Sequence, residues 1–167
     1  MSVYLYILPF LLSCFLIYRR RDLKTTLDEL LGKSQFQIGK WECVKDLSFL
    51  VVATLVIRMT LKLSSPAIRA PELFSYEFFR DVLMASFSEE LLFRGVLMRA
   101  LKNTYGENSF KPFLLNVAIF VSFHNLRFTN YYAVLLLGIL LAISYRRFSS
   151  VNICILLHFL WNFCRFV

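Results

Sequence analysis

The stretch SEELLFRG, Ser88–Gly95, decides the fold, because it places three charged residues inside an otherwise apolar helix. Unpaired charges at Glu89, Glu90 and Arg94 would oppose insertion at the centre of a bilayer by on the order of 8 to 10 kcal/mol. Glu90 and Arg94 lie one helical turn apart and can pair. Glu89 lies about 100° around the helix and needs another partner. Residues this costly to bury indicate a functional site.

The composition predicts a polytopic helical membrane protein. Of the 167 residues, 58% are hydrophobic, and a soluble domain of this length has no core large enough to hide that fraction. Repeated apolar runs of about 15 to 20 residues instead match the length of membrane-spanning helices. We therefore predict an all-α bundle with about six transmembrane helices and a short surface amphipathic helix, formed as a single membrane domain over residues 1–167.

The predicted helices follow one another along the chain. Val3–Tyr18 is the first span, and leucines at helical spacing before Gly32 indicate a short amphipathic helix on the membrane surface. Residues 1–77 hold these N-terminal segments, and residues 78–166 hold the helices that carry the polar residues. The later spans are predicted at Ser48–Leu63, Phe78–Lys102, Pro112–His124, Tyr131–Tyr145 and Val151–Phe166.

The basic residues predict the orientation. Of the 19 lysines and arginines, most fall in the connections on one side of the predicted spans. The positive-inside rule makes that side cytoplasmic and places the N-terminus and the C-terminus outside. The net charge of +8 is thereby interpreted as a topology signal. We expect the lipid bilayer, and no nucleic acid, as the partner of this charge.

Two further predicted helices carry polar side chains. His124 ends one of them, with Phe120 one turn before it, and His158 and Asn162 lie one turn apart on the last. A single buried histidine is more often an interior hydrogen-bonding residue than a catalytic one, but two adjacent intramembrane carboxylates reverse that expectation. Three helices can direct one polar cluster to a single point: Glu89, Glu90, Arg94, His124, His158 and Asn162.

Such a cluster can activate water. Arg94 can stabilise one carboxylate as the anion, which leaves the other to accept a proton. A general base of this kind, with a histidine sharing the water, activates it for attack on a carbonyl. A histidine and an asparagine at i and i+4 can stabilise the resulting oxyanion, which is often worth about 3 to 4 kcal/mol. No serine or cysteine has an evident base beside it, so peptide hydrolysis by water is favoured over a nucleophilic triad.

Three separate pieces of the sequence resemble the signature motifs of one family. EELLFR (Glu89–Arg94), FVSFH (Phe120–His124) and HFLWN (His158–Asn162) resemble the EExxxR, FxxxH and HxxxN motifs of the CPBP family. This family comprises CAAX type II prenyl proteases and bacteriocin-processing or immunity-associated membrane proteins. The resemblance covers residues 78–166 and implies an intramembrane endopeptidase of the glutamic type in a prokaryotic cell membrane.

The resemblance also implies roles for the cluster. The catalytic residues would be Glu89 and His124, which activate the water, and His158 and Asn162, which form the oxyanion hole; Glu90, Arg94 and Phe120 would support them. No cofactor is expected, in part because the HExxH signature is absent. In a metal-dependent variant of the mechanism, Glu89, His124 and His158 would be the zinc ligands.

The substrate and two other functions stay open at this level. The expected substrate is a membrane-bound or membrane-proximal protein, cleaved at a C-terminal sorting tail, a CAAX-like lipidated end or a leader. One alternative is a non-catalytic immunity or scaffold protein of the membrane, although such a protein has no reason to keep both glutamates and both histidines. A transporter or proton relay is the other alternative, but it predicts polar linings in more helices than the sequence shows.

Overall fold

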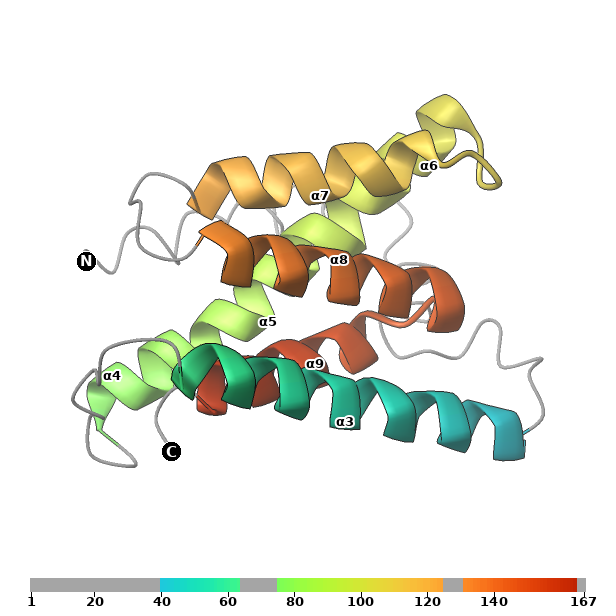
Figure 1. Cartoon of the computed structure of the whole chain (residues 1–167). Helices are drawn as coiled ribbons and strands as arrows, with labels where there is room; N and C mark the ends of the chain where they lie inside the picture. Colours follow the sequence, from blue (N-terminus) through green and yellow to red (C-terminus); the bar gives the residue numbers. More distant parts are fainter. Residues whose placement is uncertain (1–39, 64–74, 125–130, 165–167) are drawn as a thin grey trace.

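The computed structural model describes residues 40–63, 75–124 and 131–164 (Figure 1). All regular secondary structure in these ranges is helical, which confirms the predicted all-α class. The helices are α3 (Lys40–Leu63), a long helix over Tyr76–Tyr105, α7 (Lys111–His124), α8 (Tyr131–Phe148) and α9 (Val151–Phe163). The predicted span Val3–Tyr18 and the predicted surface helix lie outside the described residues.

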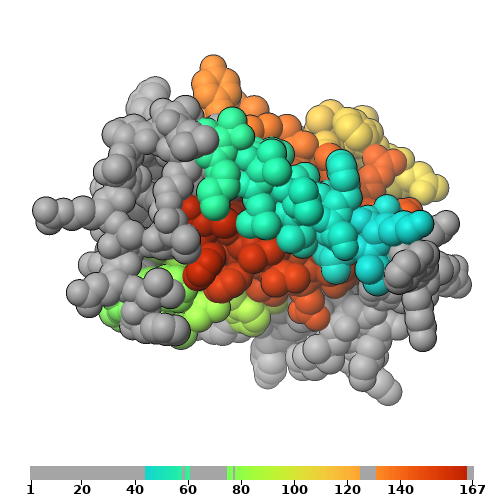
Figure 2. Space-filling model, turned by 60° about the horizontal axis from the view of Figure 1, so that its bottom comes forward, coloured from blue at the N-terminus to red at the C-terminus, as the bar shows by residue number. Residues whose placement is uncertain are grey.

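The helices form a bundle in which the long helix crosses the others. Helix α7 packs on α8, α8 packs on α9, and α3 packs on both α8 and α9. Figure 1 shows α7, α8 and α9 running in alternating directions, while the long helix passes diagonally behind them. Figure 2 shows α3 lying along α9. The middle of the long helix therefore lies inside the bundle, where it contacts α9.

The long helix is continuous but contains two wide turns. It consists of α4 (Tyr76–Phe78), the π-helical segment η1 (Phe79–Met84), α5 (Ala85–Glu90), the π-helical segment η2 (Leu91–Leu97) and α6 (Met98–Tyr105). The residue after each of the first four segments keeps right-handed helical backbone angles, so the helix does not break at these joints. Segments of this kind occur mostly as single turns inside α-helices and often mark functional sites. The two glutamates lie between them.

The predicted spans agree with the observed helices in position and differ at their ends. Helix α3 begins at Lys40, eight residues before the predicted Ser48, and so includes the segment KWECVKDL, in which charged and apolar residues are mixed. Helix α8 continues to Phe148, whose side chain is buried. The long helix extends to Tyr105 and ends at Gly106, whose φ of 90° suits glycine. Helix α9 ends at Phe163, and the last predicted residues of that span lie outside the described part.

Length and apolarity identify one clear membrane span in the described ranges. Tyr131–Phe148 is long and apolar enough to cross a membrane by itself, whereas the apolar helices Lys111–His124 and Val151–Phe163 are shorter. The long helix contains the charged cluster, which lowers its mean hydropathy. The count of six spans therefore stays a prediction.

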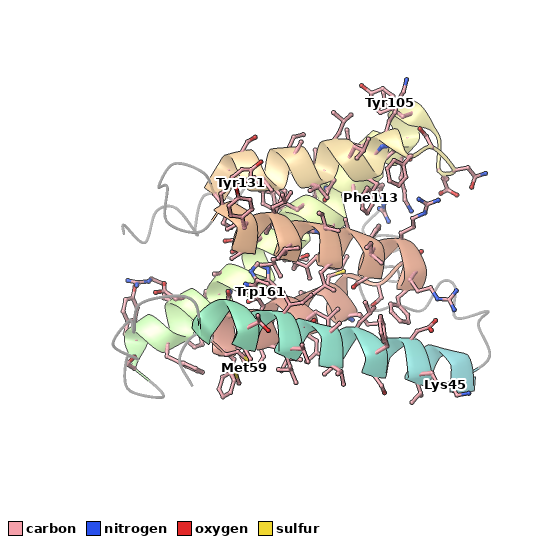
Figure 3. All side chains as sticks on the ribbon, in the orientation of Figure 1. Lys45, Met59, Tyr105, Phe113, Tyr131 and Trp161 are labelled. Carbon is pink, nitrogen blue, oxygen red and sulfur yellow. The ribbon has the colours of Figure 1, made fainter. Side chains whose placement is uncertain are left out.

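One end of the bundle carries basic side chains next to aromatic rings, and we call it the basic end. Figure 3 shows Lys45 and Tyr105 toward this end, and Met59 and Tyr131 toward the other. Cation–ring contacts join Lys102 to Tyr145, Lys111 to Tyr105 and Arg146 to Phe110, at 5.2, 5.9 and 5.7 Å from the ring centroids. Arg147 forms an ion pair with Asp46 of α3. Cations beside aromatic rings are typical of a membrane–water interface.

Candidate active site

The long helix and α7 bring Glu89 and His124 into direct contact. His124 Nε2 lies 2.9 Å from Glu89 Oε2, although the two residues are 35 positions apart in the chain. The Glu89 side chain is 8% exposed and the His124 side chain is 24% exposed. Glu89 therefore finds its partner on α7, separate from the Glu90–Arg94 pair. The contact between Glu89 and His124 lies at a partly exposed place in the bundle.

Hydrogen-bond chemistry limits the protonation states of this pair. His124 Nδ1 lies 2.8 Å from the Phe120 carbonyl oxygen, which can only accept, so Nδ1 carries a hydrogen and donates it. The contact between His124 Nε2 and Glu89 needs one further proton. That proton lies either on Nε2 beside a carboxylate or on Glu89 beside a neutral ring. Glu89 and His124 thus share one transferable proton.

Glu90 has a different environment one residue further along the helix. Its Oε1 accepts a hydrogen bond of 2.9 Å from Arg94 Nη1, and both side chains are fully buried. Arg94 also donates to the Gly138 carbonyl of α8 at 3.3 Å. The guanidinium carbon of Arg94 lies 4.5 Å from the centroid of the Phe120 ring. The predicted pairing of Glu90 with Arg94 is present in the structure, and the contacts of Arg94 connect the pair to α7 and α8.

His158 on α9 links the two glutamates. Its Nδ1 lies 2.8 Å from Glu90 Oε1, the carboxylate oxygen that also accepts from Arg94, so Nδ1 is the donor. Its Nε2 faces Glu89 Oε2 at 3.9 Å. In a neutral His158 ring this Nε2 is an acceptor, and it becomes a donor when the ring takes a second proton.

Asn162 lies one turn after His158 and contacts the first wide turn. Its side-chain Nδ2 donates to the Asp81 carbonyl at 3.3 Å and to Ser86 Oγ at 3.2 Å. Ser86 is fully buried and donates in turn to the Val82 carbonyl at 2.6 Å. An amide nitrogen has two hydrogens, so in this arrangement both are directed at acceptors of the long helix.

The structure thus brings together six of the seven side chains expected from the sequence, whereas the Asn162 amide contacts Asp81 and Ser86 instead. Glu89, His124 and His158 face one another, Glu90 and Arg94 lie deeper, and the Phe120 ring lies 4.4 Å from the His124 ring and 6.2 Å from the His158 ring, measured between centroids. Sequence reasoning missed Ser86 and Asn116. The spacing of Asn116, one turn before Phe120 on the same face of α7, was the available signal.

In the described part of the chain, no group of three His, Cys, Asp or Glu side chains is arranged to hold a metal ion. The polar side chains at this site are two carboxylates and two imidazoles beside the Arg94 guanidinium. They can bind a water molecule and move its proton between an oxygen and a nitrogen.

Comparison with known families identifies the class of hydrolase. The sequence model of the Rce1-like type II CAAX prenyl endopeptidases matches residues 71–164, which is more than half of the chain. The chain belongs to this family, whose members are integral membrane peptide hydrolases. The matched range contains all three motifs that form the site. Comparisons with curated proteins and with solved structures found no match.

Proposed function

We propose that the chain is a glutamic-type intramembrane endopeptidase in which Glu89 and His124 activate a water molecule. The 2.9 Å contact between Glu89 Oε2 and His124 Nε2 is the observation that carries this proposal. In the state with the shared proton on His124, Glu89 is a carboxylate with its second oxygen available as a base. The Glu90 carboxylate is engaged by Arg94 and His158, which makes Glu89 the better candidate.

The reaction then proceeds by addition and collapse. Glu89 takes one proton from the water while the water oxygen forms a bond to the carbon of the scissile peptide. The electron pair of the carbonyl double bond moves to its oxygen, which becomes the oxyanion. When the carbonyl re-forms, the carbon–nitrogen bond breaks and the leaving nitrogen takes the proton from Glu89. General acid–base catalysis of this kind contributes about 10²- to 10⁴-fold to the rate.

The oxyanion would be stabilised from α9. His158 Nε2 points toward the Glu89 side chain and donates to the oxyanion when the ring carries a proton on both nitrogens. The hydrogen bond from Nδ1 to Glu90 stabilises that doubly protonated ring, because a carboxylate lies beside the positive charge. Asn162 would be the second donor. One of its amide hydrogens would leave its present acceptor, the Ser86 hydroxyl oxygen or the Asp81 carbonyl, and point at the oxyanion instead.

The proposed substrate is a membrane-bound or membrane-proximal protein with a CAAX-like lipidated end. The family description supports this class, and a C-terminal sorting tail or a leader peptide are the other members of the class to test. The proposed location is a prokaryotic cell membrane crossed several times by the chain, with the basic end toward the cytoplasm. His124 lies at the end of α7 away from Lys111, so the site would open toward the outer side.

The test compares three forms of the full chain at matched levels in membranes: wild type, Glu89→Gln, and Glu107→Gln as a control in an exposed turn. A prenylated CAAX peptide is supplied, and new peptide termini are measured by mass spectrometry in the same membranes. We expect cleavage by wild type and by Glu107→Gln, and a loss of at least about 100-fold for Glu89→Gln. Equal termini in all three would show that Glu89 is not catalytic and would favour a binding protein.

A further inference from the structure

Each wide turn of the long helix receives an asparagine from a neighbouring helix. In η1, the Asp81 carbonyl accepts from Asn162 of α9 at 3.3 Å. In η2, the Phe93 carbonyl accepts from Asn116 of α7 at 2.7 Å, and it also accepts the backbone N–H of Met98, five residues later. The two asparagines therefore hold the turns on either side of the glutamates. Asn162 belongs to a predicted motif, whereas Asn116 does not.

Asn116 lies on the same stripe of α7 as two of the predicted site residues. Asn116, Phe120 and His124 are four residues apart and face the long helix on successive turns. They contact the Phe93 carbonyl, the Arg94 guanidinium and the Glu89 carboxylate, respectively. Asn116 is fully buried, so its amide cannot exchange this partner for solvent water.

We propose that Asn116 is a positioning residue for the catalytic pair, which rests on the function proposed above. His124 lies about 12 Å along α7 from Asn116. The hydrogen bond from Asn116 to the Phe93 carbonyl holds α7 against the long helix at the other end of this stretch. It also satisfies a carbonyl in the wide turn that separates Glu90 from Met98. A change at Asn116 therefore alters both the position of α7 and the turn that holds Arg94, without touching the reacting atoms.

The loss of this hydrogen bond has a specific expected consequence. Without the donor, the buried Phe93 carbonyl keeps only its backbone partner, and α7 can slide or rotate against η2. A misplacement of about 1 Å in a catalytic constellation can lower a rate by about 100-fold. The effect falls on kcat, because Asn116 lies away from the open side of the site and has no surface for substrate binding.

The test uses the full chain in detergent micelles, with Asn116→Leu as the variant and a prenylated CAAX peptide as the probe. Asn152→Leu is the matched control, since Asn152 is exposed in the first turn of α9. We expect kcat to fall by about 10- to 100-fold for Asn116→Leu, with KM within about twofold, and both constants to be unchanged for the control.

A second measurement is independent of activity. The chain contains two histidines, so labelling histidine with ¹⁵N gives one set of ring signals for each, assigned with His158→Gln. We expect Asn116→Leu to shift the ring signals of His124, which lies on α7, by more than those of His158 on α9. If Asn116→Leu does not fold, Asn116→Ser replaces it, because the serine hydroxyl is too short to reach Phe93.

The outcomes separate this proposal from the proposed function. Shifted His124 signals with a lowered kcat support both. Shifted His124 signals with no cleavage by any form, wild type included, support the positioning role and count against the endopeptidase proposal. Unchanged His124 signals overturn the positioning role, whether or not cleavage is lowered.

Discussion

The replacement Arg94→Met tests how much of the bundle depends on the buried charge pair. The variant keeps a long apolar side chain against Phe120 but removes the hydrogen bonds to Glu90 Oε1 and to the Gly138 carbonyl. Glu90 is then a carboxylate with 0% side-chain exposure and no positive partner except a protonated His158. Removing one partner of a buried pair destabilises a protein by about 3 to 5 kcal/mol, and we expect a loss in that range.

The replacement Glu90→Gln should destabilise the bundle by a similar amount and for a similar reason. The amide oxygen can still accept from His158, but the Arg94 charge stays buried without a carboxylate, which costs about 3 to 5 kcal/mol. The double variant removes both charges together. Because no charge is then left unpaired, we expect a loss of at most about 2 kcal/mol. The two changes should therefore be non-additive by at least about 4 kcal/mol.

The assay is the free energy of unfolding, measured by titrating sodium dodecyl sulfate into dodecyl maltoside micelles and following helicity. Arg147→Met is the control, because Arg147 pairs with Asp46 at an exposed place and should contribute no more than about 1 kcal/mol. Additive losses in the double variant, or a loss for Arg94→Met no larger than that of the control, would refute the idea that the pair is buried and mutually dependent.

Three further predictions concern packing, orientation and metal dependence. In Gly138→Ala, the new Cβ would lie 3.0 Å from Phe120 Cδ1, so we expect a stability loss of about 1 to 3 kcal/mol and a lowered cleavage rate in the same micelle assays. In a chain whose four cysteines are replaced by serine, a membrane-impermeant maleimide should label Tyr132→Cys in intact cells and Lys111→Cys only after permeabilisation; the reverse pattern would invert the proposed orientation. Treatment with 1,10-phenanthroline should leave cleavage unchanged, and inhibition that zinc restores would favour the metal-dependent mechanism.

The helices could be predicted from the sequence because their signals are local. Pro112 predicts the start of α7 at its first turn, and the helix begins at Lys111. Arg146 and Arg147 predict the end of α8, which continues by one buried residue, Phe148. Charge placement and helical spacing also predicted that Glu89, His124 and His158 lie close together, since polar side chains on apolar helices are easily recognised.

The partners within the site could not be predicted in the same way. Helical spacing places His158 beside Asn162, but it says nothing of which acceptor each one finds. In the structure His158 donates to Glu90, while Asn162 donates to the Asp81 carbonyl and to Ser86. The wide turns escaped prediction for the same reason. The Asp81 and Phe93 carbonyls in these turns accept hydrogen bonds from asparagines on other helices. The sequence of residues 76–105 alone therefore does not predict the turns.

The two adjacent glutamates acquire different roles from a single helical step. A rotation of about 100° separates their side chains. That rotation directs Glu90 into the bundle, where its side chain and that of Arg94 are 0% exposed, and directs Glu89 toward His124, which is 24% exposed. A buried carboxylate with a permanent cation beside it is suited to holding helices and to orienting His158. A carboxylate that shares one proton with a partly open histidine is suited to exchanging protons with water, and this difference is why we place the chemistry on Glu89.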